Sequence, residues 1–241
     1  GSSNQPVALT IELIGTNTIT GTYGIFLNAE ISASSYGTNA SLTITSENNG
    51  SLEVSGSNHG IFVKSGKGNA SLNIEKATVT SSTDGEYAAG VCVQSSAYAT
   101  SSPQLSLKVN GGSLTASGGT SSDGILFYVG SSIANNATTS LTVSDNAIVD
   151  AKTGGIKASD PNPNDLSDQI VVGPGTGTSG GIVWNDSEGT VYGDVELQED
   201  LEIGEGESLT LDDGASLDAN GHNVIVDGGT LGEGLAESFG Q

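Results

Sequence analysis

A short motif recurs along the chain and constrains its fold more than any other feature: a glycine, a β-branched residue and then alternating apolar positions. It occurs six times, with its glycine at Gly24, Gly60, Gly90, Gly124, Gly155 and Gly181. Successive glycines are 26 to 36 residues apart. A repeat of this length is typical of solenoids, in which each turn of the chain packs only against its neighbours.

Two other families of short segments recur out of phase with the glycine motif. One reads Ser-Leu-x-Ile or Ser-Leu-x-Val at residues 41–44, 71–74, 106–109 and 140–143, and a weaker one occurs at 51–54 and 113–116. Apolar residues alternate in both, so each segment is expected to be a strand with one buried face. Such short strands bury their inward residues only by stacking, which predicts an all-β parallel β-helix of about seven turns with ~30 residues per turn. A β-sandwich is the alternative.

Composition and charge exclude several other classes of protein. Gly, Ser, Thr and Asn make up 111 of the 241 residues, and Met and Arg are absent, so an α-rich fold is not expected. The net charge of −22 argues against nucleic acid and anionic membranes as partners. A single cysteine, Cys92, cannot form an intrachain disulfide.

The acidic residues are concentrated in the last third of the chain. Residues 159–241 contain 18 of the 28 acidic residues and no lysine. We expect residues 1–7 to be an expression scar and leader, residues 8–184 to form the β-helix turns, and residues 185–241 to be a tighter acidic continuation of the solenoid or a cap. Ca²⁺ is the one cofactor that this acidic section suggests, because carboxylates are its preferred ligands. The candidate ligands are Asp186, Glu188, Asp212 and Asp213, although acid dispersed for solubility is the simpler interpretation.

The repeated Gly-Ile and Ser-Leu-x-Ile strands, spread over residues 8–231, resemble the right-handed parallel β-helix proteins of the pectin-lyase-like superfamily. That superfamily includes many secreted bacterial adhesins, so the resemblance implies a right-handed solenoid and an extracellular or bacterial cell-surface location. It also includes lyases and hydrolases, and the scaffold alone does not decide between them.

An enzyme of this superfamily usually needs Ca²⁺-binding carboxylates and an Arg or Lys base. This chain has no Arg, and Lys157 is the only lysine expected to point outward from a glycine-motif strand. Residues 183–186 faintly resemble a lyase segment in which the aspartate, here Asp186, helps to bind calcium. We instead expect Trp184 to be a core residue, His59 an exposed turn residue, Cys92 a passive thiol, and Asp212 with its neighbour a solvated turn.

A column of outward-facing residues is the main candidate binding surface. If the β-branched residues of the glycine motif face inward, the residues that follow them face outward, and five of these six are apolar. The column consists of Phe26, Phe62, Cys92, Leu126, Lys157 and Val183. Either the long loops cover it, with Tyr36, Tyr98 and Ile133 packing on it, or it binds a partner. The predicted binding residues are Phe26, Phe62, Leu126, Tyr36 and Tyr98.

These features lead us to expect a non-enzymatic extracellular β-helix module of a bacterial surface protein, used for adhesion or carbohydrate contact. Its expected partner is a glycan or protein on a cell surface, and we expect a monomer. Two alternatives stay open: a carbohydrate-active enzyme, either polysaccharide lyase or glycoside hydrolase, and a purely structural spacer.

Overall fold

The computed structural model describes residues 6–29, 38–96, 102–130, 137–159, 170–175 and 179–239. Within these residues the chain is almost entirely β-structure, with helix at about 3%. The one helix described is α1 (Glu233–Phe239). No helix in these segments has the length and apolar character needed to cross a membrane.

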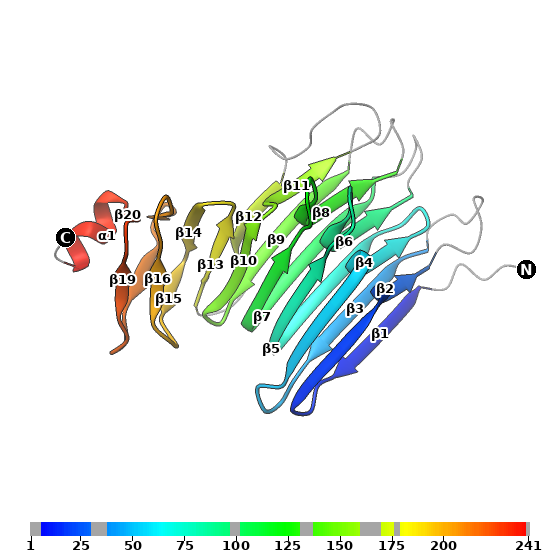
Figure 1. Cartoon of the computed structure of the whole chain (residues 1–241), viewed down its shortest axis with the longest axis horizontal. Helices are drawn as coiled ribbons and strands as arrows, with labels where there is room; N and C mark the ends of the chain where they lie inside the picture. The colour runs from blue at the N-terminus through cyan, green and yellow to red at the C-terminus, as the bar shows by residue number, and fades with distance from the viewer. Residues whose placement is uncertain are drawn as a thin grey trace, which may run out of the picture.

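The strands stack in three parallel columns, as the repeat predicts, and form a solenoid of about four turns (Figure 1). The glycine column contains the strands of the glycine motif. Its members pair in parallel in the order β2 (Thr16–Asn28), β4 (Ser51–Ser65), β6 (Ala89–Ser95), β8 (Asp123–Val129) and β11 (Ile156–Ser159). The parallel pairing excludes the β-sandwich alternative, whose sheets are antiparallel.

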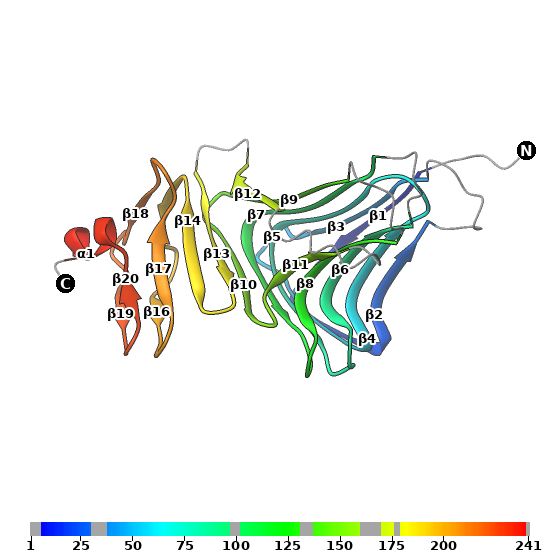
Figure 2. The same ribbon diagram turned by 90° about the horizontal axis from the view of Figure 1, so that it is seen from above.

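The serine column contains the Ser-Leu strands. Its members are β1 (Val7–Glu12), β3 (Ala40–Thr45), β5 (Ala70–Thr83), β7 (Gln104–Ser117), β9 (Thr138–Ser144) and β12 (Ile170–Pro174). The third column combines the N-terminal halves of β2 and β4, the C-terminal halves of β5 and β7, and then β10 (Ala147–Thr153) and β13 (Gly181–Asn185). Figure 2 shows the glycine and serine columns as two walls of the solenoid.

The core lies between these walls and is built by residues in register. Leu42, Leu72, Leu107 and Leu141 occupy equivalent positions of the serine column and are fully buried. Alternation along each strand directs one face inward, and stacking then joins these faces into one continuous apolar cluster. The inward positions predicted for the Ser-Leu strands are therefore confirmed.

The recurring glycine is required because its neighbours approach closely. A Cβ atom on Gly60 would lie 2.6 Å from the carbonyl oxygen of Gly90 and closer still to Oγ of Ser81. The same position one turn earlier, Gly24, would bring a Cβ to 2.6 Å from the carbonyl oxygen of Gly60. Distances this short leave no room for a side chain, so the glycine column can pack against the third column only where the residue is glycine.

The sixth glycine motif does not belong to the glycine column, and the count of about seven turns is not confirmed. Residues Gly181 to Asn185 form β13, which pairs with β10 in the third column, so that Val183 lies beside Val149. The serine-column strand that precedes it, β12, lacks the Ser-Leu signature and is not recognisable from the repeat. Because β12 cannot be recognised in the sequence, the Gly-Ile motif at Gly181 was predicted to lie in the glycine column, whereas it lies in the third column.

The chain changes direction after β13. β14 (Glu188–Tyr192) pairs antiparallel with β13. Shorter strands then pair in parallel: β14 with β17 (Ser208–Leu211) and β20 (Thr230–Leu231), β15 (Asp194–Glu196) with β18 (Ser216–Asp218), and β16 (Leu201–Ile203) with β19 (Val224–Val226). A second core cluster around Trp184 and Leu209 fills this section, and Leu235 of α1 is buried in it.

One ion pair joins the two core regions. Nζ of Lys152, on β10, lies 2.9 Å from Oε1 and from Oε2 of Glu207 and 4.1 Å from the centre of the Trp184 ring. Partial burial raises the pKa of Glu207, but hydrogen bonds from Lys152 and from the N–H of Gly204 outweigh it, so the pKa is lowered overall. Lys152 therefore links the main solenoid to the C-terminal section.

Candidate functional site

The outward column exists as a stack of residues in register. Phe26 pairs with Phe62, Phe62 with Cys92, Cys92 with Leu126, and Leu126 with Lys157. Phe62 and Cys92 form an apolar cluster of their own, separate from the main core, with Leu126 packed against it. Their predicted outward direction is confirmed.

Val183 does not belong to this column, contrary to the sequence prediction. It is buried in the main core cluster, because β13 stacks on β10 of the third column. Trp184 is buried as predicted, but in the second core cluster. The side chains of Val183 and Trp184 thus serve two different cores on opposite faces of one strand.

Four rings gather at the start of the outward column, and we call them the aromatic cluster: Tyr23, Phe26, His59 and Phe62. The ring centroids of Tyr23 and Phe26 are 4.7 Å apart, and those of Phe26 and Phe62 are 5.0 Å apart with planes inclined by 12°. His59 lies 4.7 Å from Phe62. Offset stacking at these distances is favourable beyond simple burial and holds the rings in place.

The sequence prediction missed Tyr23 and His59. Strict alternation puts residues three apart on opposite faces of a strand, so Tyr23 and Phe26 would point in opposite directions. The strand is irregular here, because the register of β2 against β4 shifts between Gly21 and Tyr23. A signal was present in the sequence, since an aromatic ring precedes the motif glycine in the first two turns alone.

His59 is a structural member of the cluster rather than the exposed turn residue that we predicted. It lies within β4 and is partly buried, and its Nδ1 accepts a hydrogen bond from the N–H of Ala89 at 2.9 Å. Burial lowers the pKa of His59, and the hydrogen bond that Nδ1 accepts requires this nitrogen to be unprotonated. The hydroxyl oxygen of Tyr23 accepts a hydrogen bond from Nδ2 of Asn58 at 2.8 Å, which fixes the ring from its polar end.

Exposure falls along the column from Phe26 to Cys92 and rises again at Leu126 and Lys157. Phe26 is 44% exposed, whereas Phe62 is 7% exposed and Cys92 is buried. Burial, followed by the nearby charge of Asp123, raises the pKa of the Cys92 thiol far above its usual range, so the thiol is unreactive. The accessible ring is therefore that of Phe26. The other two predicted binding residues, Tyr36 and Tyr98, lie outside the described residues, as does Ile133.

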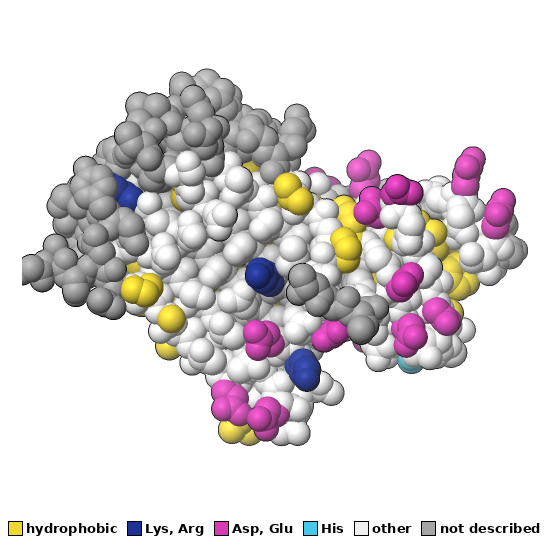
Figure 3. Space-filling model, turned by 180° about the vertical axis from the view of Figure 1, so that it is seen from behind, with side chains coloured by type: hydrophobic (Ala, Val, Ile, Leu, Met, Phe, Trp, Pro, Cys, Tyr) yellow, Lys and Arg dark blue, Asp and Glu magenta, His cyan; other side chains and the backbone are white. Residues whose placement is uncertain are grey.

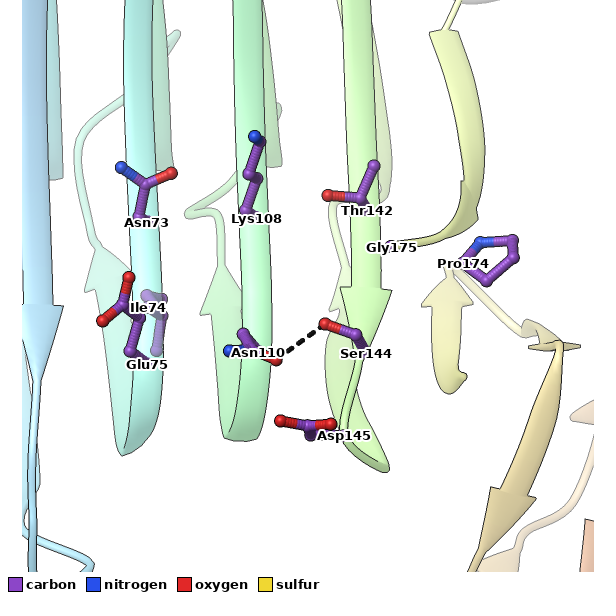
Figure 4. A pocket seen from close by; sticks show the side chains of 10 residues that line it. All are labelled: Asn73, Ile74, Glu75, Lys108, Asn110, Thr142, Ser144, Asp145, Pro174 and Gly175. Atoms are coloured by element: carbon purple, nitrogen blue, oxygen red, sulfur yellow. Dashed lines mark hydrogen bonds between the residues drawn. The ribbon is translucent and has the colours of Figure 1, made fainter. Parts of the chain in front are cut away.

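A polar groove of about 440 Å³ lies on the outer face of the serine column (Figure 4). Its lining includes Asn73, Glu75, Lys108, Asn110, Thr142 and Ser144. The hydroxyl of Ser144 donates a hydrogen bond to Oδ1 of Asn110 at 2.8 Å. The groove offers donors and acceptors to a hydroxylated ligand, but none of the residues that line it is aromatic.

Lys157 and Asp186 are the residues that an enzyme would need. Nζ of Lys157 lies 2.9 Å from Oδ1 of Asp123. Asp186 occupies the turn between β13 and β14 with a positive φ of 51°, and its carboxylate lies over Gly155. Lys157 is therefore held in an ion pair with Asp123, on the glycine column.

The four predicted calcium ligands fall into two separate pairs. Asp186 and Glu188 flank the start of β14, whereas Asp212 and Asp213 follow β17, beside the end of β14. Four residues of strand separate the pairs, or about 13 Å. Within the described segments no three His, Cys, Asp or Glu side chains come together as a metal site. Figure 3 shows the carboxylates spread over the C-terminal section.

The fold and the two surfaces define the chain as a parallel β-solenoid with an aromatic cluster on one outer face and a polar groove on another. Comparison of the chain with models of protein families, with curated proteins and with solved structures finds no match.

Proposed function

We propose that the chain is a non-enzymatic extracellular β-helix module of a bacterial surface protein, which contacts the apolar faces of sugars in a cell-surface glycan. The observation that carries this proposal is the exposed ring of Phe26, stacked on Tyr23 and Phe62 at the start of the outward column. Leu126 extends the same surface, and Tyr36 and Tyr98 stay predicted contact residues. A protein on a cell surface is the other partner to consider.

The physical basis is a flat apolar surface that is already ordered. A ring held between neighbours loses little conformational freedom on binding, so more of the contact energy appears as affinity. The net charge of −22 repels anionic glycans, which makes a neutral glycan the better ligand. The polar groove lacks a ring for sugar stacking, so we assign the contact to the aromatic cluster.

The proposal includes the finer features of the fold that the resemblance implies. We infer a right-handed solenoid and regard the strands from β14 to β20 as its tighter acidic continuation, since paired residues there are 20 to 23 apart in sequence. A composition rich in Ser, Thr, Asn and Gly, with one cysteine, is in keeping with a secreted bacterial protein.

A carbohydrate-active enzyme is the alternative, with calcium near Asp186. It requires a base and a carboxylate pair on one face, and Lys157 is already paired with Asp123 at 2.9 Å. A purely structural spacer is the third possibility, and it predicts that no glycan binds at all.

Affinity electrophoresis in gels that contain a polysaccharide tests the proposal. We expect retardation by at least one of three neutral polymers, xyloglucan, barley β-glucan or galactomannan, and none by polygalacturonate. Phe26→Ala should weaken the retardation several-fold, whereas Ile14→Ala, which removes another exposed apolar side chain outside the cluster, should not. Absence of retardation in every gel, or equal retardation of Phe26→Ala, contradicts the proposal.

A further inference from the structure

Tyr87 is an exposed aromatic residue outside the aromatic cluster. It lies in the turn of residues 84–88, which connects β5 to β6, and it is 80% exposed. Its φ is 58°, in the left-handed region that a large side chain rarely adopts. The turn therefore holds an aromatic ring in water on a strained backbone, and strain of this kind is often found at functional sites.

Hydrogen bonds on both sides of Tyr87 fix the turn. The hydroxyl of Ser122, from the next turn of the solenoid, donates to the carbonyl oxygen of Gly85 at 2.7 Å. The oxygen of the same hydroxyl accepts from the N–H of Ala88 at 3.2 Å. The N–H of Gly85 also donates to Oγ1 of Thr83 at 3.1 Å. The position of Tyr87 is therefore set by the solenoid itself, and its ring loses little freedom when it makes a contact.

The backbone shape of this turn recurs one turn later, but the aromatic side chain does not. Ala89 pairs with Asp123, so Ser121 is the counterpart of Tyr87, and its φ is 60°. The corner thus requires a left-handed residue, and a small residue meets this requirement with less strain. The backbone does not explain a tyrosine here, and a residue that is 80% exposed adds little to the core. Contact with a ligand outside the chain does explain it.

A groove of about 320 Å³ adjoins this turn, and we call it the hydroxyl groove. Five hydroxyl side chains and one carboxylate line it: Thr20, Ser55, Ser57, Ser82, Thr83 and Asp84. Each hydroxyl both donates and accepts hydrogen bonds, as the hydroxyls of a sugar do, and the carboxylate disfavours an anionic ligand. Asp84 is also the first residue of the turn that carries Tyr87, so the groove and the ring are neighbours.

Hydrogen bonds also connect this turn to the aromatic cluster. Oγ1 of Thr83 donates to the carbonyl oxygen of Asn58 at 3.0 Å, and Nδ2 of Asn58 donates to the hydroxyl oxygen of Tyr23 at 2.8 Å. Asn58 therefore bonds to the hydroxyl groove through its backbone and to the aromatic cluster through its side chain. The two surfaces adjoin each other at Asn58.

We propose that the glycan site extends from the aromatic cluster past Asn58 to the hydroxyl groove and Tyr87. Its ligand is then a stretch of several sugars within a neutral polysaccharide rather than a single terminal sugar. Tyr87 packs on the apolar face of one sugar, and the groove bonds to the hydroxyls of its neighbours. Two contacts on one chain bind more tightly than either alone. This inference rests on the proposed function, because Phe26 provides the other end of the site.

Affinity electrophoresis of the full chain in gels of xyloglucan, barley β-glucan and galactomannan tests the extended site. In the gel that retards the wild type, we expect Tyr87→Ala and Tyr87→Gly to weaken the retardation several-fold and Tyr87→Phe, which keeps the ring, to preserve it. Tyr87→Gly should melt no lower than the wild type, because glycine adopts this φ without strain. Ser82→Ala should also weaken binding, whereas Thr80→Ala, an exposed hydroxyl on the same strand outside the groove, should not.

Titration calorimetry with oligosaccharides of increasing length, prepared from the same polymer, gives a second measurement. We expect the affinity of the wild type to rise with length, and that of Tyr87→Ala to stop rising at a shorter length. Wild-type retardation and length dependence in Tyr87→Ala, together with weakened binding in Phe26→Ala, overturn the extended site and leave the proposed function in place. Absence of retardation of the wild type in all three gels overturns both. Loss of binding in Tyr87→Ala but not in Phe26→Ala contradicts a site that spans the two surfaces.

Discussion

At the scale of single residues, Phe26 and Phe62 are paired in register but have different surroundings. Phe62 has strands on both sides, β2 and β6, and is nearly buried, whereas Phe26 lies on the first strand of its column and keeps an open face. The sequence predicted that both point outward. It did not predict their unequal exposure, because exposure depends on the number of neighbouring turns and not on the local pattern.

Phe62→Ala should lower the free energy of unfolding by about 2–4 kcal/mol, because it removes a nearly buried ring and leaves a cavity among the other rings. Phe26→Ala should lower it by a smaller amount, about 1 kcal/mol, since 44% of that residue is already exposed to water. Urea denaturation followed by circular dichroism measures both. Equal losses for the two variants would show that the column is either fully covered or fully exposed.

His59 should make stability depend on pH in the mildly acidic range. Burial lowers its pKa in the folded protein below the ordinary value of 6.5, so near that pH the unfolded chain binds a proton that the folded chain does not. Stability is therefore complete above pH ~6.5 and falls as the pH drops toward the lower folded value. The melting temperature is to be measured at pH values from about 7.5 to about 5.5. Its fall over this range should be smaller for His59→Gln than for the wild type. An identical decline in His59→Gln and the wild type would refute this role.

At the scale of strands, the sequence predicted two columns and the weaker third column correctly. It failed where a strand lacked the repeated signature, as in β12, and the error carried over to the next strand, β13. Pairing in a solenoid is decided by which neighbour offers a matching edge and core, and a four-residue motif contains only part of that information. The register of β2 against β4 also shifts between Gly21 and Tyr23, and the local pattern does not show this shift. Two of the four rings of the aromatic cluster, Tyr23 and His59, were therefore not predicted.

Gly60→Ala tests whether the glycine column depends on close backbone approach. The added Cβ would lie 2.6 Å from a backbone oxygen, so strands must shift, and we expect a loss of about 2 kcal/mol or more in the free energy of unfolding. Gly173→Ala, on β12, is the control, because nothing lies within 4 Å of the added atom. Denaturant midpoints measure both, and similar midpoints for the two variants would rule out the steric explanation.

Lys152→Met tests the link between the two core regions. It removes the ion pair with Glu207 and the contact with Trp184, and we expect a loss of about 1 kcal/mol because both charges are partly buried. Lys157→Met removes a more exposed ion pair and should cost under ~0.5 kcal/mol. Thermal unfolding compares them, and a larger effect at Lys157 would contradict the assignment of Lys152 as the link.

At the scale of the whole molecule, the repeat fixed the parallel solenoid, but the number of turns and the change of direction at β14 were not predictable from it. The antiparallel pairing of β13 with β14 follows from a tight turn at Asp186, where the chain reverses instead of continuing into a strand of the glycine column. The polar groove also escaped prediction, because it is formed by residues from four strands of the serine column (β5, β7, β9 and β12) that only stacking brings together. Surfaces shared between turns depend on register, which local sequence does not display.

The most direct test of the proposed function asks whether the protein binds a polysaccharide without cutting it. The protein is incubated for a long period, with added calcium, with whichever neutral polysaccharide retards it, and with polygalacturonate, and the chain lengths are then measured by size-exclusion chromatography. A non-catalytic contact surface predicts continued retardation by the neutral polymer and unchanged chain lengths for both. Shortened chains, with cleavage lost in Lys157→Ala or Asp186→Ala, would contradict it and establish an enzyme.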